Sequence, residues 1–189
     1  VNYHGVKGLR VGASFYYNQT AKNGTKPWRN TGYKFPVTIV TGDLQYKGFN
    51  NNLIVRGNAV YGNLGASGAL TTINNSSSAA SGYPNTTVAQ NAVSYGGEAG
   101  YNIGSFFHSK APRIYPFIRY EYYNPMEKTE ANTGLLADKR FQVSAVTAGL
   151  NYYALPNLVI KADYTHRSIG GGKYNDENLV SVGIAYIGW

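Results

Sequence analysis

The sequence predicts an all-β protein, an antiparallel transmembrane β-barrel with eight strands in this chain. Apolar and polar residues alternate with a period of two from one end of the 189 residues to the other. The alternating segments run for about 11 to 13 residues. This exceeds the ~5–6 residues of globular strands and suits the ~9–11 tilted residues that cross a bilayer. Only 14% of the residues are charged, and the 23 Gly and 18 Tyr favour strands and turns.

Each predicted strand has one apolar side and one side that is charged or small. In the first strand, Val11 and Phe15 lie opposite Arg10, and in the seventh, Ile160 lies opposite Lys161. In a membrane the apolar side meets lipid and the charged side lines the lumen, whereas in water the apolar side would line a core. The predicted strands are residues 9–20, 37–48, 52–63, 92–104, 113–124, 141–153, 157–169 and 178–189.

The connections between these strands alternate in length. Outer-membrane barrels join their strands by short periplasmic turns and long outer loops in strict alternation. The same order here predicts one domain over residues 1–189, with both termini in the periplasm. The loop at 64–91 either folds inward as a constriction or lies at the surface. The short connections are 49–51, 105–112 and 154–156, and the long loops are 21–36, 64–91, 125–140 and 170–177.

Tyrosines gather near the ends of the predicted strands, as at Tyr16, Tyr61, Tyr123 and Tyr153. An apolar ring with a hydrated hydroxyl favours the membrane interface, where aromatic girdles form. The alternative is that these are ordinary strand tyrosines paired across a sheet. Pro116 lies inside a predicted strand, so a bulge or a strand end is expected there.

The charged residues that share the inward side are the candidate pore-lining set. Against lipid at the midplane, an Arg or Lys would cost on the order of 2–4 kcal/mol, so we expect these side chains to face the lumen. They would form a salt-bridged plug in a narrow barrel or line water in a wider one, where the mild positive excess favours anions weakly. In the last strand we expect Val182, Ile184 and Tyr186 to face lipid. The predicted lumen set is Arg10, Asp43, Lys47, Arg56, Glu98, Arg119, Glu121, Lys161, Asp163 and Arg167.

Several functional classes are disfavoured. The chain has no Cys, which removes disulfide frameworks and thiolate zinc sites, and it has no apolar run long enough for a transmembrane helix. The net charge of +8 is dispersed rather than clustered, so nucleic-acid binding is not expected. His4, His108 and His166 lack metal-ligand spacing. Asp163 and His166 fall on opposite strand faces. We predict no enzyme activity, no metal and no cofactor.

The two ends of the sequence carry expectations of their own. Val1 does not begin a signal peptide, so either a leader has been removed or the chain starts partway through a longer one. In the last strand, Trp189 is one position out of step with Tyr186 and Gly188. We expect one further aromatic residue after it, with a bulge near Gly188 as the alternative.

Six stretches of the chain share a further likeness: Gly8–Ser14, Asp43–Tyr46, Leu53–Gly57, Pro116–Asn124, Leu150–Tyr153 and Leu158–Trp189. These stretches resemble outer-membrane porins of Bacteroidetes, of the phosphate-selective porin O and P type. The resemblance implies a passive channel for small solutes and a barrel of about sixteen strands, of which this chain is the C-terminal part. Phosphate selectivity does not carry over, because no dense ladder of inward arginines is present. The alternative is a closed eight-stranded barrel with a structural or adhesive role.

The resemblance and the strand pattern together predict a location in the outer membrane of a Gram-negative bacterium. The expected partners are outer-membrane lipids, lipopolysaccharide and small solutes. A homo-oligomer such as a trimer, or a larger membrane complex, is also expected. The loop at 21–36 carries Lys22, Lys26, Arg29 and Lys34 around Trp28. It is a candidate contact for lipopolysaccharide phosphates, with a solvated charged loop as the alternative.

Overall fold

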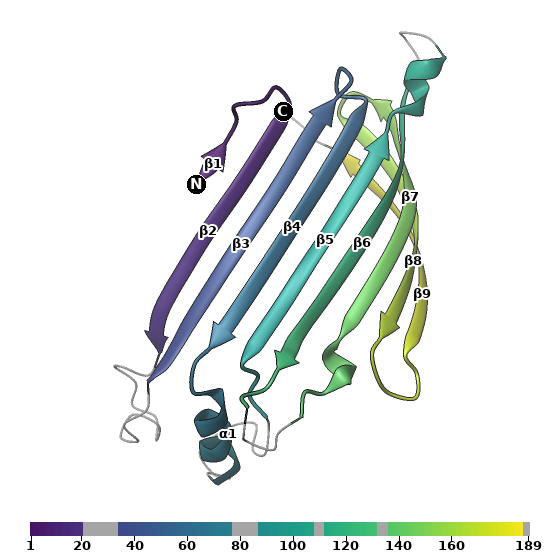
Figure 1. The fold of residues 1–189 in the computed structure, drawn as a ribbon. Helices are drawn as coiled ribbons and strands as arrows, with labels where there is room; N and C mark the ends of the chain where they lie inside the picture. The colour runs from purple at the N-terminus through teal and green to yellow at the C-terminus, as the bar shows by residue number, and fades with distance from the viewer. Residues whose placement is uncertain (21–33, 77–86, 108–111, 132–135, 187–189) are drawn as a thin grey trace.

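A computed structural model describes residues 1–20, 34–76, 87–107, 112–131 and 136–186. Across these residues the chain forms one antiparallel sheet of nine strands, in which every strand pairs with its neighbours in sequence (Figure 1). The predicted all-β, antiparallel class is therefore confirmed. The strands are β1 (Asn2–Tyr3), β2 (Leu9–Thr20), β3 (Phe35–Gly48), β4 (Leu53–Leu64), β5 (Asn91–Tyr101), β6 (Arg113–Lys128), β7 (Val143–Leu155), β8 (Leu158–Ile169) and β9 (Asp176–Tyr186).

Among the described residues, the structure adds the short β1 and three helical elements to the predicted strands. A helix, α1 (Ser67–Ser76), occupies part of the predicted loop 64–91, and two short 3₁₀ helices, η2 (Ile103–Phe106) and η3 (Lys139–Phe141), lie in other connections. In α1 the Thr71 hydroxyl donates to the Ser67 carbonyl. A polar segment that is typical of a loop thus forms hydrogen bonds between its side chains and its own helix backbone. No helix among the described residues combines the length and hydropathy needed to span a bilayer.

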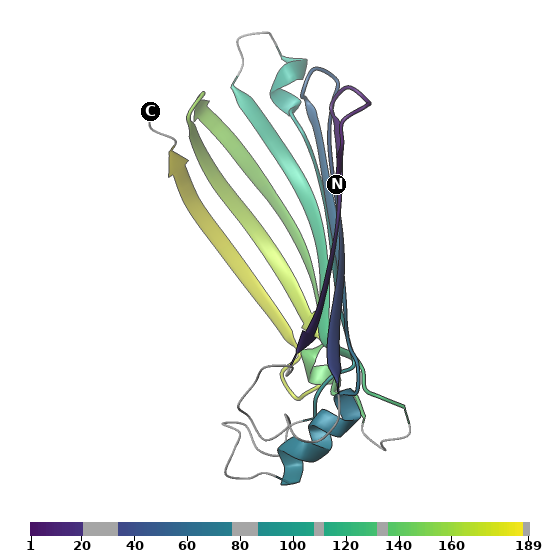
Figure 2. The same cartoon turned by 90° about the vertical axis from the view of Figure 1, so that its left-hand side faces the viewer.

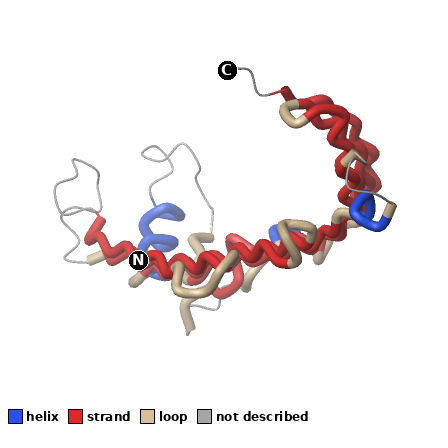
Figure 3. The backbone as a smooth tube through the Cα atoms, turned by 90° about the horizontal axis from the view of Figure 1, so that it is seen from above, coloured by secondary structure: helices blue, strands red, loops and turns tan. Residues whose placement is uncertain are grey.

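The sheet is curved but not closed. It is nearly flat from β2 to β5 and bends across β6 to β9, so that one face is concave (Figure 3). The order of the strands leaves β1 and β9 as the two edges, and closure into a barrel is absent from the described residues. At the bend, a Cβ atom added to Gly149 would lie 2.6 Å from the Phe117 ring and 2.7 Å from the Asp163 Cβ. The glycine at position 149 therefore allows Phe117 and Asp163 to pack closely in the curved part of the sheet.

The two ends of the sheet differ in their connections. The β3–β4 turn is short and places Phe49, Asn50 and Asn51 at φ values of 50°, 56° and 66°, which asparagine tolerates better than most residues. The opposite end carries α1, which extends below the strands on the concave side (Figure 2). β2 begins and β9 ends at the end of the sheet that carries the β3–β4 turn (Figure 1). Most of the 21–36 loop and Trp189 lie outside the described residues.

The strand register sorts the side chains into two faces, because residues opposite each other in an antiparallel pair lie on the same face. Arg56 pairs with Glu98, Glu98 with Arg119, and Arg119 with Thr147. By such pairs all ten residues of the predicted lumen set lie on one face, which we call the charged face. Val182, Ile184 and Tyr186 lie on the other, which we call the apolar face.

The apolar face is largely uncovered. Ile118, Val182 and Ile184 are 59%, 76% and 72% exposed, whereas a strand in a water-soluble sheet would bury such side chains against a second layer. Among the described apolar residues only Phe35, Tyr115 and Val143 are buried. The described part of the chain therefore has almost no core of its own.

Candidate functional site

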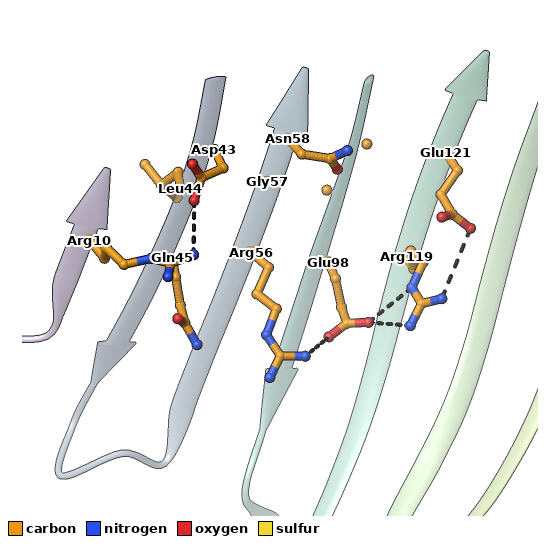
Figure 4. Close-up of a pocket in the computed structure, with 12 residues that line it drawn as sticks. Arg10, Asp43, Leu44, Gln45, Arg56, Gly57, Asn58, Glu98, Arg119 and Glu121 are labelled. Carbon is orange, nitrogen blue, oxygen red and sulfur yellow. Dashed lines mark hydrogen bonds and ion pairs between the residues drawn. The ribbon is translucent and has the colours of Figure 1, made fainter. Parts of the chain in front are cut away.

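The candidate site is a shallow cavity of about 390 Å³ on the charged face. Figure 4 views it from the side opposite to Figure 1, which is the concave side of the sheet. The residues come from five neighbouring strands, β2 to β6, and form a row across the strands rather than along one of them. The charged residues that line the cavity are Arg10, Asp43, Arg56, Glu98, Arg119 and Glu121.

Glu98 is the centre of this row. Its Oε1 accepts a hydrogen bond from Arg56 Nη1 at 3.2 Å, and its Oε2 accepts two from Arg119, from Nε at 2.9 Å and from Nη2 at 2.6 Å (Figure 4). The register explains this geometry, because β4, β5 and β6 place the three residues directly opposite one another. The Glu98 side chain is only 17% exposed, against 57% for Arg56 and 41% for Arg119. One carboxylate thus partly neutralises two guanidinium groups that are more exposed than it is.

Further ion pairs extend the row to both sides. Arg10 lies 2.9 Å from Asp43, and Arg119 also lies 4.0 Å from Glu121. Gly12, opposite Asp43, leaves the space into which the Asp43 carboxylate folds. Pairs this exposed contribute about 0–1 kcal/mol each to stability. Their main effect is to set the sign and position of charge along the concave surface.

A second cavity, of about 360 Å³, lies on the same face nearer the bend. Arg167 lines it and donates from Nη1 to Glu177 at 2.8 Å and from Nη2 to the Tyr123 hydroxyl at 3.2 Å. The Arg167 Nε is buried and has no hydrogen-bond partner in the described part of the chain. An unmatched donor of this kind at a polar cavity offers a hydrogen bond to a polar solute or to water.

The predicted lumen set is gathered on one face but not into one cluster. Lys47, Lys161 and Asp163 lie on the charged face but do not line either of these two cavities, and none of them forms an ion pair with another described residue. Sequence reasoning missed Arg113 and Glu177, which the register places on the same face. Glu177 fell in a predicted loop, and Arg113 is followed on its face by the aromatic Tyr115 rather than by another charge. They carry opposite charges, so the mild positive excess is unchanged.

Charged side chains also form hydrogen bonds in the connections at the end of the sheet that carries α1. Glu130 accepts hydrogen bonds from the Gly68 N–H at 2.6 Å and from the Ser67 hydroxyl at 3.4 Å, at the N-terminus of α1. In the β6–β7 connection, Asp138 accepts hydrogen bonds from the side chain and the backbone N–H of Arg140, which lower the pKa of Asp138 below its ordinary value.

The arrangement on the charged face is suited to hydration and to weak, reversible contacts with solutes. Within the described residues no group of three or more His, Asp or Glu side chains converges as a metal site would require. Comparison with protein-family models, with curated proteins and with solved structures returned no match. We therefore infer the function from the geometry of the two faces.

Proposed function

We propose that the chain forms part of the wall of an outer-membrane, porin-like channel for the passive diffusion of small polar solutes. The observation that carries the proposal is the exposed apolar face, which lies opposite a face that bears a row of ion pairs, on strands of 11 to 16 residues. Strands of this length span the hydrocarbon layer, lipid covers the apolar face, and the charged face meets water.

The curvature and the free edges support the wall of a wider barrel. Unpaired edges cannot face lipid, because each unsatisfied backbone group there costs several kcal/mol. In the proposed channel, further strands would therefore join β9 to β1. A closed eight-stranded barrel, the alternative predicted from the sequence, would pair β9 with β2 directly, and β1 already occupies part of that edge.

The solutes that suit this wall are small and polar, with weak charge selection. Most of the arginines on the charged face are already paired with carboxylates, so the excess positive charge attracts anions only mildly. The paired groups still present polar atoms to water and to dipolar solutes. We therefore propose that neutral and zwitterionic solutes also pass, and that anions are preferred only weakly.

Single-channel recording of the native full-length protein in planar lipid bilayers tests the proposal. We expect steady open-channel currents that scale with salt concentration and an anion-to-cation permeability ratio slightly above one. A correctly folded, heat-modifiable sample that gives no current would overturn the channel and favour a structural role.

The orientation of the two faces has a separate test, for which the absence of native cysteine is convenient. Val182 and Gly183 are adjacent in β9 and lie on opposite faces. In lipid vesicles, a fluorophore on Val182→Cys should be quenched by brominated lipids, and Gly183→Cys should react with a charged, water-soluble thiol reagent. The reverse pattern would contradict the proposed orientation.

A further inference from the structure

A chain of hydrogen bonds links a serine, a histidine and an asparagine on the apolar face, away from the proposed channel surface. Ser168 Oγ lies 3.4 Å from His166 Nε2, and His166 Nδ1 lies 2.9 Å from Asn178 Oδ1. The sequence predicted no catalytic group because Asp163 lies on the opposite face from His166, and the register agrees on that point. The orienting group is instead an asparagine on the neighbouring strand, which sequence spacing did not reveal.

The local fold explains how the three residues meet. His166 and Ser168 are two apart in β8, so they point to the same face, and Asn178 of β9 is the direct cross-strand partner of His166. The Asn178 carbonyl oxygen can only accept, so it fixes the hydrogen of His166 on Nδ1 and leaves the Nε2 lone pair toward Ser168. This is the relation of nucleophile, base and orienting group that activates a serine.

Two contacts modify the resting geometry. Ser168 Oγ donates to Asp176 Oδ1 at 2.7 Å, so its hydrogen must turn toward His166 before reaction. The Tyr164 hydroxyl donates to Asn178 Oδ1 at 2.7 Å and holds the amide in place. Hydrogen bonds between a nucleophile and its base are often long in a free enzyme and shorten when substrate binds.

The position on the face indicates the substrate. Along β9 the residues on this face change from Tyr186, Ile184, Val182 and Val180 to Asn178 and Asp176. The three residues therefore lie where the apolar surface gives way to a polar one, at the end of the sheet that carries the long connections. An ester bond of a membrane lipid lies at this kind of boundary, between its acyl chain and its polar head group.

We propose that Ser168, His166 and Asn178 form a hydrolytic site for carboxylic esters, with lipid acyl esters as the substrate class. Ser168 Oγ bonds to the carbonyl carbon and passes its proton to His166 Nε2. The ester C–O bond then breaks, and the leaving alkoxide takes that proton and departs as the alcohol. Water attacks the acyl-serine and gives a proton to His166, which returns it to Ser168 Oγ as the carboxylic acid leaves. The choice of a lipid ester rests on the proposed membrane location, but the three-residue geometry does not.

The first test uses the native protein in detergent micelles with p-nitrophenyl butyrate and a fluorophosphonate probe. We expect ester hydrolysis and a single covalent adduct, mapped by peptide mass to Ser168. Ser144 is the matched control, because it is the direct cross-strand partner of Ser168 on the same face and forms no hydrogen bond with a histidine of the described residues. Ser168→Ala and His166→Ala should lower kcat by about 100-fold or more, and Ser144→Ala should leave it unchanged.

The role of Asn178 as a positioning residue needs a readout of its own. Asn178→Ala should lower kcat with little change in KM, and Asn178→Asp should restore most of the activity, since a carboxylate also accepts from Nδ1. Far-UV circular dichroism confirms that each variant is folded. Absence of adduct on Ser168 in the folded protein, or full activity of Ser168→Ala, would overturn the site.

A second measurement separates the substrate class from the site. Release of fatty acid from phosphatidylethanolamine in mixed micelles is expected to depend on Ser168 in the same way. Hydrolysis of the soluble ester without any release from the lipid would retain the site and reject lipid as its substrate. Neither outcome depends on whether the protein conducts ions.

Discussion

Glu98 determines how the charge of the concave surface is presented. Its carboxylate faces Arg56 on one side and Arg119 on the other, and it is the least exposed of the three side chains. Two guanidinium groups that would otherwise attract anions are therefore partly neutralised by one residue. Removal of this single charge should release both groups at once.

Glu98→Gln should make the proposed channel more selective for anions. Loss of one negative charge near a solvated path changes the energy of a passing ion by up to about 1 kcal/mol, which corresponds to about five-fold in relative permeability. The measurement is the reversal potential in a potassium chloride gradient. Glu121→Gln is the matched control, because Glu121 is 53% exposed and contacts Arg119 only at 4.0 Å, and it should shift the potential less. Equal shifts would show that the local pairing does not matter.

Gly149 lies where the sheet bends, and a side chain there has no room. Gly149→Ala should lower the free energy of unfolding by about 1–3 kcal/mol, because the new Cβ forces the Phe117 ring and Asp163 apart. At Gly183 an added Cβ meets nothing within 4 Å, so Gly183→Ala should change stability by no more than about 0.5 kcal/mol. Urea unfolding in detergent, followed by tyrosine fluorescence, measures both. A neutral Gly149→Ala would contradict the close packing at the bend.

Alternation was a reliable guide to which residues share a face, and a poor guide to which residues touch. The period of two placed Arg10, Arg56 and Lys161 on the side of their own strands that lies opposite the apolar residues. Successive side chains of a strand point to opposite faces, so the pattern requires this placement. Contacts such as that of Glu98 with both arginines depend on the register between strands, which the alternation of one strand does not contain. For the same reason, the alternation did not predict that Asn178 contacts His166.

At the scale of the element, α1 is attached to the rest of the protein through a different connection. Glu130, which follows β6, accepts from the N-terminal Gly68 and Ser67 of the helix, and the Val88 N–H donates to the Thr71 hydroxyl. A carboxylate at a helix N-terminus is favourable because the unpaired N–H groups there are its donors. The helix is thus held on the concave side from two later segments of the chain.

Glu130→Ala should loosen α1 without unfolding the sheet. Loss of the carboxylate should cost the helix about 1 kcal/mol, so the amide protons of residues 68–75 should exchange with solvent about five-fold faster. Hydrogen–deuterium exchange with mass spectrometry measures this. Glu127→Ala is the control, because Glu127 contacts Tyr122 and Asn124 rather than α1. Unchanged exchange in the Glu130 variant would show that other contacts hold the helix.

The strands were predictable from the sequence and the helix was not. β2 was predicted at residues 9–20 and lies at Leu9–Thr20, since a long alternating run with a turn after it has few other solutions. α1 has the sequence SGALTTINNS, in which Ser, Thr and Asn compete with helix formation by bonding to the backbone. Its contacts with Glu130 and Val88 join residues that are separated in the sequence, so the local pattern does not contain them.

At the scale of the whole molecule, the described sheet has an uncovered apolar face and two unpaired edges. The uncovered apolar face is unfavourable in water and suits the proposed barrel wall in lipid, where both edges would have to be paired. The consequence can be measured at β9, whose outer edge has no partner among the described strands.

In the native protein in membranes, the outer edge of β9 should be paired. We expect the amide protons of Leu179–Ala185 to be as strongly protected from exchange as those of β5, in the middle of the sheet. Hydrogen–deuterium exchange on vesicles, with β5 as the internal reference, provides the comparison. Fast exchange along alternate residues of β9 in the folded protein would mean that the edge stays open, and the proposed barrel would be wrong.

Because every strand pairs only with the strands before and after it in sequence, the sheet has a low contact order for an all-β protein. Each new hairpin can close a short loop on an edge that is already formed, so the entropy cost is divided into small steps. Assembly would then proceed like a zipper along the chain, and each growing edge would serve as the template for the next strand. In the proposed barrel, the last pairing would join β9 to a strand far away in sequence. That pairing would require a long loop to close, and it would set the rate at which the barrel is completed.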